Sequence, residues 1–411
     1  MNDILSKKIV PYFQPIIAAD TNDIYAYEAL GRYIDDDGSV KSLGAFFSDG
    51  SVSAKDALQV DRIVRKQALK KFAEERKEEY LFINMRLEWI AKYENRPDEA
   101  PTVSWAKEFG VDLRKLVIEI TEEEFFADRE PVANIIAYYK SMGCRIAIDD
   151  YGKCASDIGR LALLSPDILK LDMSCVHKSE KSYHYREYMK AISSFAERVG
   201  IEALYEGIET QAQLDICIGS KGRYYQGFLL AEPQPSILSP SASRSVFSSS
   251  SRRLINRLHE KADRVNSRRK YWDSRVEGFF SKKAFDASGE DDVNDYFSRM
   301  FAELSPHIRR IFLCNKWGDQ LSYNIEAENG EVKANDYRRR NWLWRGYFQE
   351  ALTMLGSGMK SHLTDAYRDV TTKEKIYTYI FSINEDLYLF IDILQSKNAD
   401  CELNGRALPK N

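Results

Sequence analysis

The heptapeptide CRIAIDD, residues 144–150, is an apolar run that ends abruptly in two acidic residues. The same plan recurs at YLFIN (80–84), KLVIEIT (115–121), DILKLD (167–172) and IEALYEG (201–207). Short apolar runs separated by amphipathic stretches are typical of parallel strands whose two faces are covered by helices. The runs therefore predict an α/β fold built on a parallel sheet.

Three further runs bring the number of predicted strands to about eight, the number that closes a (β/α)8 barrel. They are YFQPIIA (12–18), IYAYEALGRY (24–33) and YYQGF (224–228). Periodicity alone does not separate a closed barrel from an open doubly wound sheet, so both architectures stay open at this point.

The amino-acid composition of the chain changes near residue 240. The segment 233–251 is rich in Ser and Pro and predicts a linker. After it, Leu254, Leu258 and Val265 begin an apolar stripe along a long helix that reaches about Phe280. The runs at 375–383 and 386–394 alternate like antiparallel strands. We expect a barrel domain (1–240), a linker and connecting helix (241–285), and a smaller α+β domain (286–411).

Composition limits the class of protein. A chain of 411 residues exceeds the usual size of a single core, and a net charge of −4 gives no overall attraction to nucleic acid or to anionic membranes. The six cysteines are scattered without a CxxC pair, which is typical of reduced thiols. Neither a signal peptide nor a membrane span is apparent. We expect a cytoplasmic protein with no nucleic-acid partner and no membrane partner.

Polar residues lie at the ends of most predicted strands: Glu28, Asn84, Glu119, Asp149, Asp150, Lys170, Glu206 and Gln226. Because the carboxyl ends of parallel barrel strands open on one face, these groups should converge on one pocket. Grouped carboxylates repel unless cations neutralise them, and oxygen ligands without His or Cys suit Mg²⁺, Mn²⁺ or Ca²⁺. Each residue alone has a simpler explanation as a rim acid or a turn former. Their recurrence at strand after strand favours a site.

An ordered series of motifs resembles the EAL family of cyclic di-GMP phosphodiesterases over about residues 8–236. YEALGR (27–32) contains the triplet that names the family, and the remaining matches follow in family order: Gln14-Pro15, FIN (82–84), IEITE (118–122), IDDYG (148–152), LKLD (169–172), YEGIET (205–210) and YQGFLLAEP (225–233). The resemblance implies a (β/α)8-like barrel with one antiparallel strand, and metal-dependent hydrolysis of cyclic di-GMP to linear pGpG.

The resemblance also implies a role for each matching residue. The metal ligands would be Glu28, Asn84, Glu119, Asp149 and Asp150. The catalytic residues would be Lys170, which orients or helps to deprotonate water, Glu206 near a second ion, and Glu122, which supports the active-site loop. The substrate would meet Gln14, Leu30, Arg32, Glu209, Gln226 and Pro233, with Arg32 on a phosphate. Mg²⁺ or Mn²⁺ would be the working ion, and Ca²⁺ would bind and inhibit.

One loop departs from the family pattern. After Gly152 the family usually has a Gly- or Ser-rich segment, whereas this chain has KCASDI (153–158). The missing glycine removes backbone freedom near the metal site, and a small misplacement there slows catalysis strongly. Two functions therefore stay open: a phosphodiesterase regulated by its C-terminal domain, and a weak or inactive domain that senses cyclic di-GMP. A nucleic-acid-binding protein would leave the acidic residues unexplained.

The C-terminal region resembles PAS-related Cache sensor domains more weakly, through WRGYF (344–348) and YRDVT (367–371). The resemblance implies that Trp344, Arg345, Tyr367 and Asp369 contact a small cytosolic ligand. The alternative, that these aromatics only fill the core of a small sheet, stays open. The apolar helix stripe, together with the pairing of barrels that is common in the EAL family, predicts a homodimer.

Overall fold

The chain forms two compact units, Met1–Asn256 and Arg257–Asn411, and the division falls within one long helix. The computed structural model describes residues 4–75, 78–86, 89, 93, 99–122, 129–153, 159, 161, 165–239, 244–283, 285, 289–304, 307–328 and 331–395. Each unit is described by itself. In these ranges, no helix has the length and apolar character that a membrane crossing requires.

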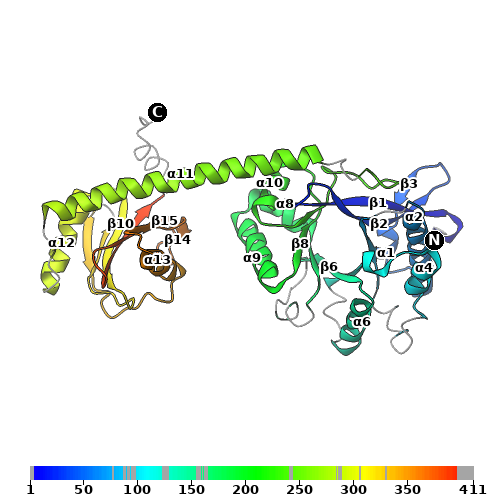
Figure 1. The fold of residues 1–411 in the computed structure, drawn as a ribbon, viewed down its shortest axis with the longest axis horizontal. Coiled ribbons are helices and arrows are strands. Elements are labelled where there is room, and N and C mark those ends of the chain that lie inside the picture. Colours follow the sequence, from blue (N-terminus) through cyan, green and yellow to red (C-terminus); the bar gives the residue numbers. More distant parts are fainter. Residues whose placement is uncertain are drawn as a thin grey trace. The chain divides into compact units, whose positions relative to one another are not determined.

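The first unit is a closed barrel of eight strands (Figure 1). The strands are β1 (Lys8–Ala18), β2 (Ile24–Ile34), β4 (Tyr80–Asn84), β5 (Leu116–Thr121), β6 (Arg145–Tyr151), β7 (Ile168–Leu171), β8 (Glu202–Tyr205) and β9 (Tyr224–Tyr225). β1 closes the ring because it pairs antiparallel with both β2 and β9, and the other barrel pairs are parallel. The predicted barrel with one antiparallel strand is confirmed, and the open sheet is excluded. β3 (Val40–Ser42) pairs with the end of β2.

Helices cover the outside of the barrel. They are α1 (Gly44–Ser48), α2 (Ala54–Glu75), α4 (Pro101–Phe109), α6 (Arg129–Ser141), α8 (Met173–Lys181), α9 (Tyr183–Val199) and α10 (Gln211–Gly219), with 3₁₀ turns at Ile4–Ser6 and Leu113–Lys115. Alternate strand residues such as Leu116, Ile118 and Ile120 join the helices in one large core. Their neighbours point into the ring because successive side chains of a strand face opposite sides. The apolar runs are therefore continuous because both faces of each strand are buried.

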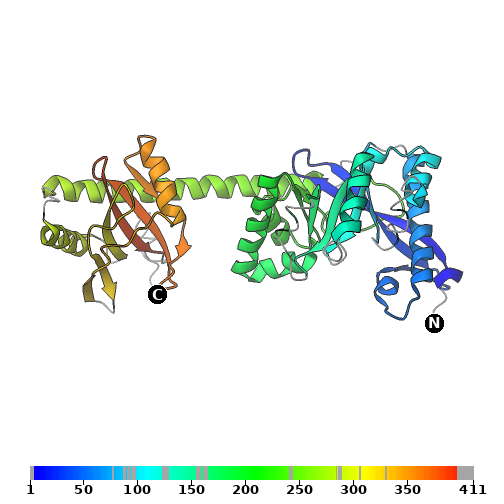
Figure 2. The same ribbon diagram turned by 90° about the horizontal axis from the view of Figure 1, so that it is seen from below.

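The second unit is a layered α+β domain (Figures 1 and 2). Its antiparallel sheet has the order β12-β11-β10-β16-β15-β13, with β14 also paired to β15. The strands are β10 (Ile308–Asn315), β11 (Asn324–Glu328), β12 (Glu331–Asn335), β13 (Ser361–Leu363), β14 (Tyr367–Arg368), β15 (Lys375–Ser382) and β16 (Leu387–Leu394). One face packs on α11 (Arg244–Lys282) and α12 (Glu290–Glu303), and the other packs on α13 (Gly346–Gly356). The predicted pairing of β15 with β16 is confirmed.

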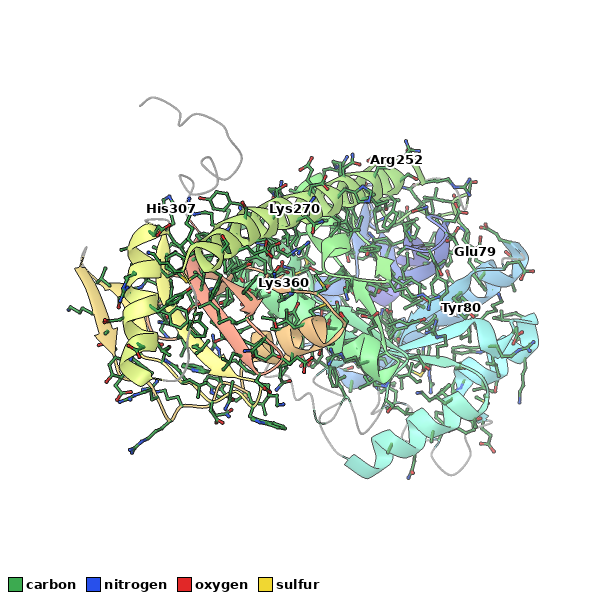
Figure 3. The ribbon with its side chains drawn as sticks, turned by 60° about the vertical axis from the view of Figure 1, so that its left-hand side comes forward. Glu79, Tyr80, Arg252, Lys270, His307 and Lys360 are labelled. Carbon is green, nitrogen blue, oxygen red and sulfur yellow. The ribbon has the colours of Figure 1, made fainter. Side chains whose placement is uncertain are left out.

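The long helix is present, but it begins earlier than expected. Trp272, Val276 and Phe279 bury its C-terminal half in the second unit. Lys360, labelled in Figure 3, pairs with Glu277 of this helix at 2.9 Å between Nζ and Oε1. Leu258, predicted on the same apolar stripe, is exposed.

The linker prediction is wrong for much of residues 233–251. Gln234 exchanges backbone hydrogen bonds with Phe13, and Leu238 accepts a hydrogen bond from the Tyr27 hydroxyl. Ile237 and Phe247 belong to the barrel core. Ser and Pro are frequent in this segment, but its long-range pairing with β1 and β2 is invisible in local composition.

Candidate active site of the barrel

The interior of the barrel is layered, and this layering places the site. Each strand contributes at least one side chain to an apolar cluster inside the ring, which includes Ile16, Ala26, Phe82, Val117, Ala147, Ile168, Leu204 and Tyr224. Two positions along each strand toward the open end, the residue is polar: Gln14, Glu28, Asn84, Glu119, Asp149, Lys170, Glu206 and Gln226. In β1, which runs the opposite way, the polar residue precedes the apolar one. The period of two along a strand therefore brings these groups into one layer.

Lys170 lies at the centre of this polar layer and is buried. Its Nζ is 2.5 Å from Oε1 of Glu119, 2.9 Å from Oδ1 of Asp149 and 2.9 Å from Oε1 of Glu206. Oε1 of Glu28 lies 3.7 Å away. One ammonium thus faces four carboxyl groups, which leaves an excess of negative charge in a buried place.

Burial and this crowding shift the pKa values of the cluster. Burial raises the pKa of Glu119 well above its ordinary value, and the Glu28 carboxylate adds to the shift. Burial also raises the pKa of Glu206. Burial alone would lower the pKa of Lys170, but its acidic neighbours outweigh burial and raise the pKa. Burial likewise opposes the ionised form of Asp149, yet Lys170 holds the pKa of Asp149 below its usual value. Lys170 is therefore an ammonium that balances part of the acidic charge.

Amide side chains hold Glu28 in this layer. Asn84 donates from Nδ2 to Oε1 of Glu28 at 3.2 Å, and Gln226 donates from Nε2 to Oε2 at 2.8 Å. The same Gln226 nitrogen is 3.1 Å from Oε1 of Gln14, whose own Nε2 donates to the carbonyl of Ala231. Gln226 thus orients the Glu28 carboxylate, and Gln14 holds Gln226 in place.

The loop after β6 carries the two adjacent acids. Asp150 has a left-handed backbone, with φ of 58°, and its amide donates to Oδ1 of Asp149. The amide of Gly152 donates to Oε2 of the buried Glu122 at 3.2 Å. Lys153 reaches back, with its Nζ 3.1 Å from Oδ2 of Asp150. Residues 154–158 of the altered loop lie outside the described residues.

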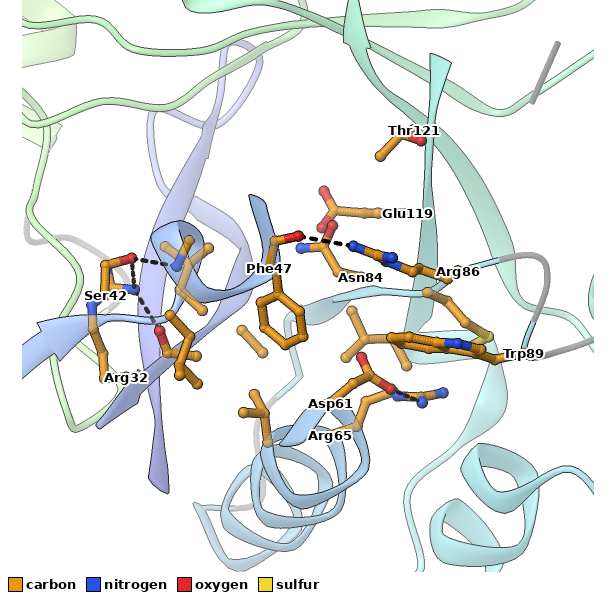
Figure 4. A pocket seen from close by; sticks show the side chains of 18 residues that line it. Arg32, Ser42, Phe47, Asp61, Arg65, Asn84, Arg86, Trp89, Glu119 and Thr121 are labelled. Atoms are coloured by element: carbon orange, nitrogen blue, oxygen red, sulfur yellow. Dashed lines mark hydrogen bonds and ion pairs between the residues drawn. The ribbon is translucent and has the colours of Figure 1, made fainter. Parts of the chain in front are cut away.

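A cavity of about 290 Å³ adjoins the polar layer (Figure 4). Leu30, Arg32, Asn84 and Glu119 all line it, so the substrate-binding candidates of β2 share it with two of the metal-ligand candidates. Arg32 donates from Nη1 to the carbonyl of Gly31, and burial lowers the pKa of its guanidinium.

The sequence did not single out the opposite wall of this cavity. Arg86 lies over the ring of Trp89 at 5.2 Å and donates to the carbonyl of Phe47, and Asp61 forms an ion pair with Arg65 (Figure 4). Arg86 stands two positions after Asn84. A search for polar residues at the ends of strands, which found the other candidates, could therefore have found Arg86 as well. Asp61 and Arg65 are four residues apart on α2, which looks like any surface pair on a helix.

Two substrate-binding candidates lie away from the cluster. Glu209 is nearly half exposed, and its Oε2 is 4.0 Å from Nε2 of His177. Pro233 precedes Gln234, which pairs with Phe13 of β1, so it adjoins the strand that carries Gln14. Glu209 lies in the loop between β8 and α10, and the described contacts do not bring it into the polar layer.

The chemistry of the polar layer fits a divalent cation. Both carboxylate oxygens of Glu119 are buried and, apart from the ion pair with Lys170, have no partner in the described part of the chain. Such oxygens, with the Asn84 carbonyl, are the ligands that hard ions prefer. Within the described ranges, no group of three or more acidic, His or Cys side chains is already arranged to hold a metal ion. The carboxylates close on the Lys170 ammonium instead.

The four C-terminal candidates divide into two groups. The Arg345 guanidinium lies over the rings of Trp344 and Tyr367, at 5.2 and 5.4 Å. Asp369 instead accepts hydrogen bonds from Thr372 and lies 3.7 Å from Arg310. Trp344 is two-thirds exposed, so it does not belong to a closed core.

Comparison with known proteins follows the same division of the chain. An EAL domain model matches residues 1–233, and a model of the EAL-domain associated signalling protein domain matches residues 242–398. The uncharacterized EAL-domain containing protein YkuI of Bacillus subtilis is 31% identical over 406 residues, which cover 95% of this chain and 96% of that protein. The probable cyclic di-GMP phosphodiesterase PdeB of Escherichia coli is 27% identical over 56% of this chain and 44% of that protein.

Solved structures agree with the sequence matches. The crystal structure of Bacillus subtilis YkuI, in complex with substrate c-di-GMP and calcium, has a TM-score of 0.84 and 30% identity and covers 94% of both chains. A c-di-GMP-bound standalone EAL protein from Vibrio cholerae has a TM-score of 0.50 and 25% identity, covering 58% of this chain and 98% of that one. With a family match over more than half of its length and a relative similar along nearly all of it, this chain belongs to the EAL-domain family.

Proposed function

We propose that the barrel binds cyclic di-GMP and hydrolyses one of its phosphodiester bonds, giving linear pGpG. The observation that carries the proposal is the polar layer, in which acids from neighbouring strands surround one buried ammonium. A buried excess of negative charge is costly to a fold unless it serves a cationic ligand. The Bacillus relative, crystallised with c-di-GMP and calcium, supports the same substrate.

The candidate metal ligands divide between two positions. Glu28, Asn84, Glu119 and Asp149 would hold one ion, and Asp150 with Glu206 would lie around a second. Divalent ions held there would activate water and neutralise charge on the phosphate. We propose Mg²⁺ or Mn²⁺ as the working ion and Ca²⁺ as an ion that binds and inhibits.

Other residues bind and position the substrate. Arg32 presents a guanidinium that can engage two oxygens of a phosphate. Lys170, held as an ammonium, forms ion pairs with Glu119 and Asp149 within the polar layer and so fixes the carboxylates around it. Glu122 accepts from the Gly152 amide and so anchors the loop that carries Asp149 and Asp150.

The cavity beside Arg32 suits one base of the dinucleotide. The flat pair of Arg86 and Trp89 offers a stacking surface, and the Asp61 carboxylate offers an acceptor for N–H groups of guanine. Its volume of about 290 Å³ is at the lower end of small-molecule sites, which supports one base rather than the whole ligand.

Incubation of the purified full chain with cyclic di-GMP and Mg²⁺ or Mn²⁺ tests this function, with the product separated by chromatography. The wild type should form linear pGpG, and Glu28→Gln should form none. Neither binding nor product in the wild type would contradict the proposal.

One observation favours the alternative function, a sensor that binds cyclic di-GMP and turns it over weakly. The Lys153 ammonium pairs with Asp150, a carboxylate of the proposed second ion position, and so competes with a cation there. In that case Lys153→Thr should raise turnover several-fold without changing affinity. An unchanged rate would remove Lys153 as the reason for weak catalysis.

We also propose that the second unit binds a small cytosolic ligand near Arg345 and Tyr367. Asp369 is linked to Tyr367 through Arg310, Asp392 and Thr378. The support is the stacking of Tyr347 on Tyr367 beneath the Arg345 guanidinium, an arrangement that suits an anionic or planar ligand. Arg345→Ala should change the turnover of the barrel only if the units are coupled.

A homodimer is the proposed assembly. Ile255 and Leu258 of α11 are about half exposed and lie three residues apart on one side of the helix. Light scattering should give twice the chain mass, and Leu258→Asp should give the monomer. A wild-type monomer at micromolar concentration would contradict the proposal.

A further inference from the structure

Two loops of the second unit carry an exposed aromatic surface that the barrel chemistry does not use. They are residues 315–321, between β10 and β11, and residues 337–345, between β12 and α13; together they form what we call the tryptophan platform. Trp317 is 69% exposed and Trp344 is 67% exposed, and Leu343 and Leu321 also lie in contact with solvent. Large apolar side chains gathered in this way usually mark an interaction surface.

Hydrogen bonds between the two loops hold the tryptophan platform in one conformation. The Asn341 side chain donates to the carbonyl of Trp317 at 2.8 Å, and the amide of Trp342 donates to the carbonyl of Gly318 at 2.9 Å. The Trp342 indole donates to Oε1 of Gln320, which fixes one loop against the other. Gly318 has φ of 88°, and a Cβ there would meet the amide of Leu343 at 3.1 Å, so this close approach of the two loops needs a glycine. The exposed indoles are thus held on a fixed backbone.

The surroundings of the tryptophans are basic. Residues 337–345, YRRRNWLWR, contain four arginines and no acid. Arg345 lies over the ring of Trp344, and Arg340 lies over the ring of Tyr337 at 4.0 Å. Two nearby cations are paired, Arg338 with Asp336 and Lys316 with Asp386. Asp319 of the first loop accepts hydrogen bonds from the Asn315 and Asn341 side chains, so its one negative charge stands against the exposed Arg339 and Arg340.

We propose that the tryptophan platform docks the protein on an anionic phospholipid surface. Indole rings favour the boundary between headgroups and acyl chains, Leu343 adds an aliphatic side chain that enters the apolar layer, and the arginines meet lipid phosphates. A second copy of this chain is a poorer occupant because two platforms of the same charge repel. This peripheral docking departs from the expectation of no membrane partner. It requires no membrane-spanning helix and is independent of the barrel chemistry.

Co-sedimentation of the full chain with lipid vesicles tests the proposal. Vesicles of equal parts phosphatidylcholine and phosphatidylglycerol should bind the wild type, and vesicles of phosphatidylcholine alone should bind it at least about tenfold more weakly. Trp317→Ala with Trp344→Ala should weaken binding about tenfold or more. Arg339→Gln with Arg340→Gln should weaken it by a similar factor and reduce its dependence on salt. Tyr183→Ala, an exposed aromatic residue on α9, is the matched control and should bind as the wild type does.

Tryptophan fluorescence of the wild type gives a second readout that needs no variant. Brominated phosphatidylglycerol should quench it on binding. Absence of vesicle binding, binding that the tryptophan variant retains, or binding without quenching would overturn the proposal. Tighter binding to a single-stranded oligonucleotide, lost in the same variants, would also overturn it and assign the platform to nucleic acid. Loss of self-association in the tryptophan variant, with no vesicle binding, would assign it to a second copy.

Discussion

Each unit of the molecule buries one cation among several carboxyl groups, and the two clusters differ in how those groups are satisfied. In the barrel, Lys170 faces the four acids of the polar layer. In the second unit, Arg310 donates from Nε to Glu326 at 3.1 Å and from Nη1 to Asp392 at 2.9 Å, and Asp369 lies 3.7 Å from its Nη2.

Neutral donors complete the second cluster. Asp392 accepts from the Thr378 hydroxyl, Glu326 accepts from the Asn324 amide, and Asp369 accepts from Thr372. The oxygens of Glu119 in the barrel have no such donor within the described residues. A buried charge cluster has a structural role when each carboxylate oxygen accepts a hydrogen bond from the protein. Carboxylate oxygens without such a donor can instead bind a ligand. The barrel cluster is therefore a ligand-binding site, and the Arg310 cluster stabilises the fold of the second unit.

Glu119→Gln should produce the largest effect and separate the two clusters most clearly. Turnover of cyclic di-GMP should fall about 1,000-fold, because the change removes charge from a metal-holding oxygen pair. The free energy of unfolding should stay the same or rise, because burial opposes the ionised form of Glu119 and the glutamine amide carries no such cost. Kinetics and denaturant unfolding measure the two effects. Glu326→Gln, the matched change in the other cluster, should reverse the pattern, with normal turnover and lower stability.

Arg310→Ala should destabilise the second unit by about 3–5 kcal/mol, because it leaves Glu326, Asp369 and Asp392 buried without their cation. Denaturant unfolding followed by tryptophan fluorescence, to which Trp272 in the core of that unit contributes, would report it. Arg310→Lys should recover part of the loss. A change in the free energy of unfolding below about 0.5 kcal/mol, the range of neutral surface substitutions, would contradict a stabilising role for this cluster.

Arg32→Ala should weaken cyclic di-GMP binding by about 2 kcal/mol, or about 30-fold, because a charge-assisted contact to phosphate is lost. Calorimetry measures it. Arg223→Ala removes an arginine that pairs with Glu202 and Asp20, partners outside the polar layer, and should leave affinity unchanged. Equal affinities for wild type and Arg32→Ala would place the phosphates elsewhere.

The smallest expected effect is a pH dependence of the second unit. Burial raises the pKa of Asp392, so the folded state holds this proton more tightly than the unfolded state does. Stability should therefore fall as pH rises above the ordinary carboxyl range, by at most about 1.4 kcal/mol per pH unit for one proton. Asp369, whose pKa is lowered, loses its contribution only below that range. Denaturant unfolding between pH 4 and 7 measures the slope, which Asp392→Asn should remove.

The fold and the polar layer were accessible from sequence because both depend on local periodicity. Successive side chains of a strand point to opposite faces, so residues two positions apart face the same side. Asp149 therefore shares the inward face with Ala147, and the same spacing at the other strands predicts the polar layer. The closing of the ring by β1 came from the family resemblance, since periodicity allowed an open sheet.

What the sequence did not reveal depends on contacts between distant segments. Gln234 joins β1 through hydrogen bonds across more than 200 residues, so a Ser/Pro-rich composition suggested a linker there. Asp61 reaches the cavity from α2, and Trp89 reaches it from the segment after β4, where no local pattern separates a pocket wall from a surface. Arg310 is one arginine in a strand, and only the sheet register brings Asp392 and Glu326 opposite it.

Calorimetric titration of cyclic di-GMP into the full chain, with Ca²⁺ or with a chelator, tests the central claim that the barrel cluster is a divalent-ion site for this ligand. Ca²⁺ should allow binding to be followed without turnover. The account predicts tight binding of the wild type in Ca²⁺, clearly weaker binding in chelator, and loss of the Ca²⁺ response in Glu119→Gln. Equal affinity of the wild type with and without Ca²⁺, or an undiminished Ca²⁺ response in Glu119→Gln, would contradict it.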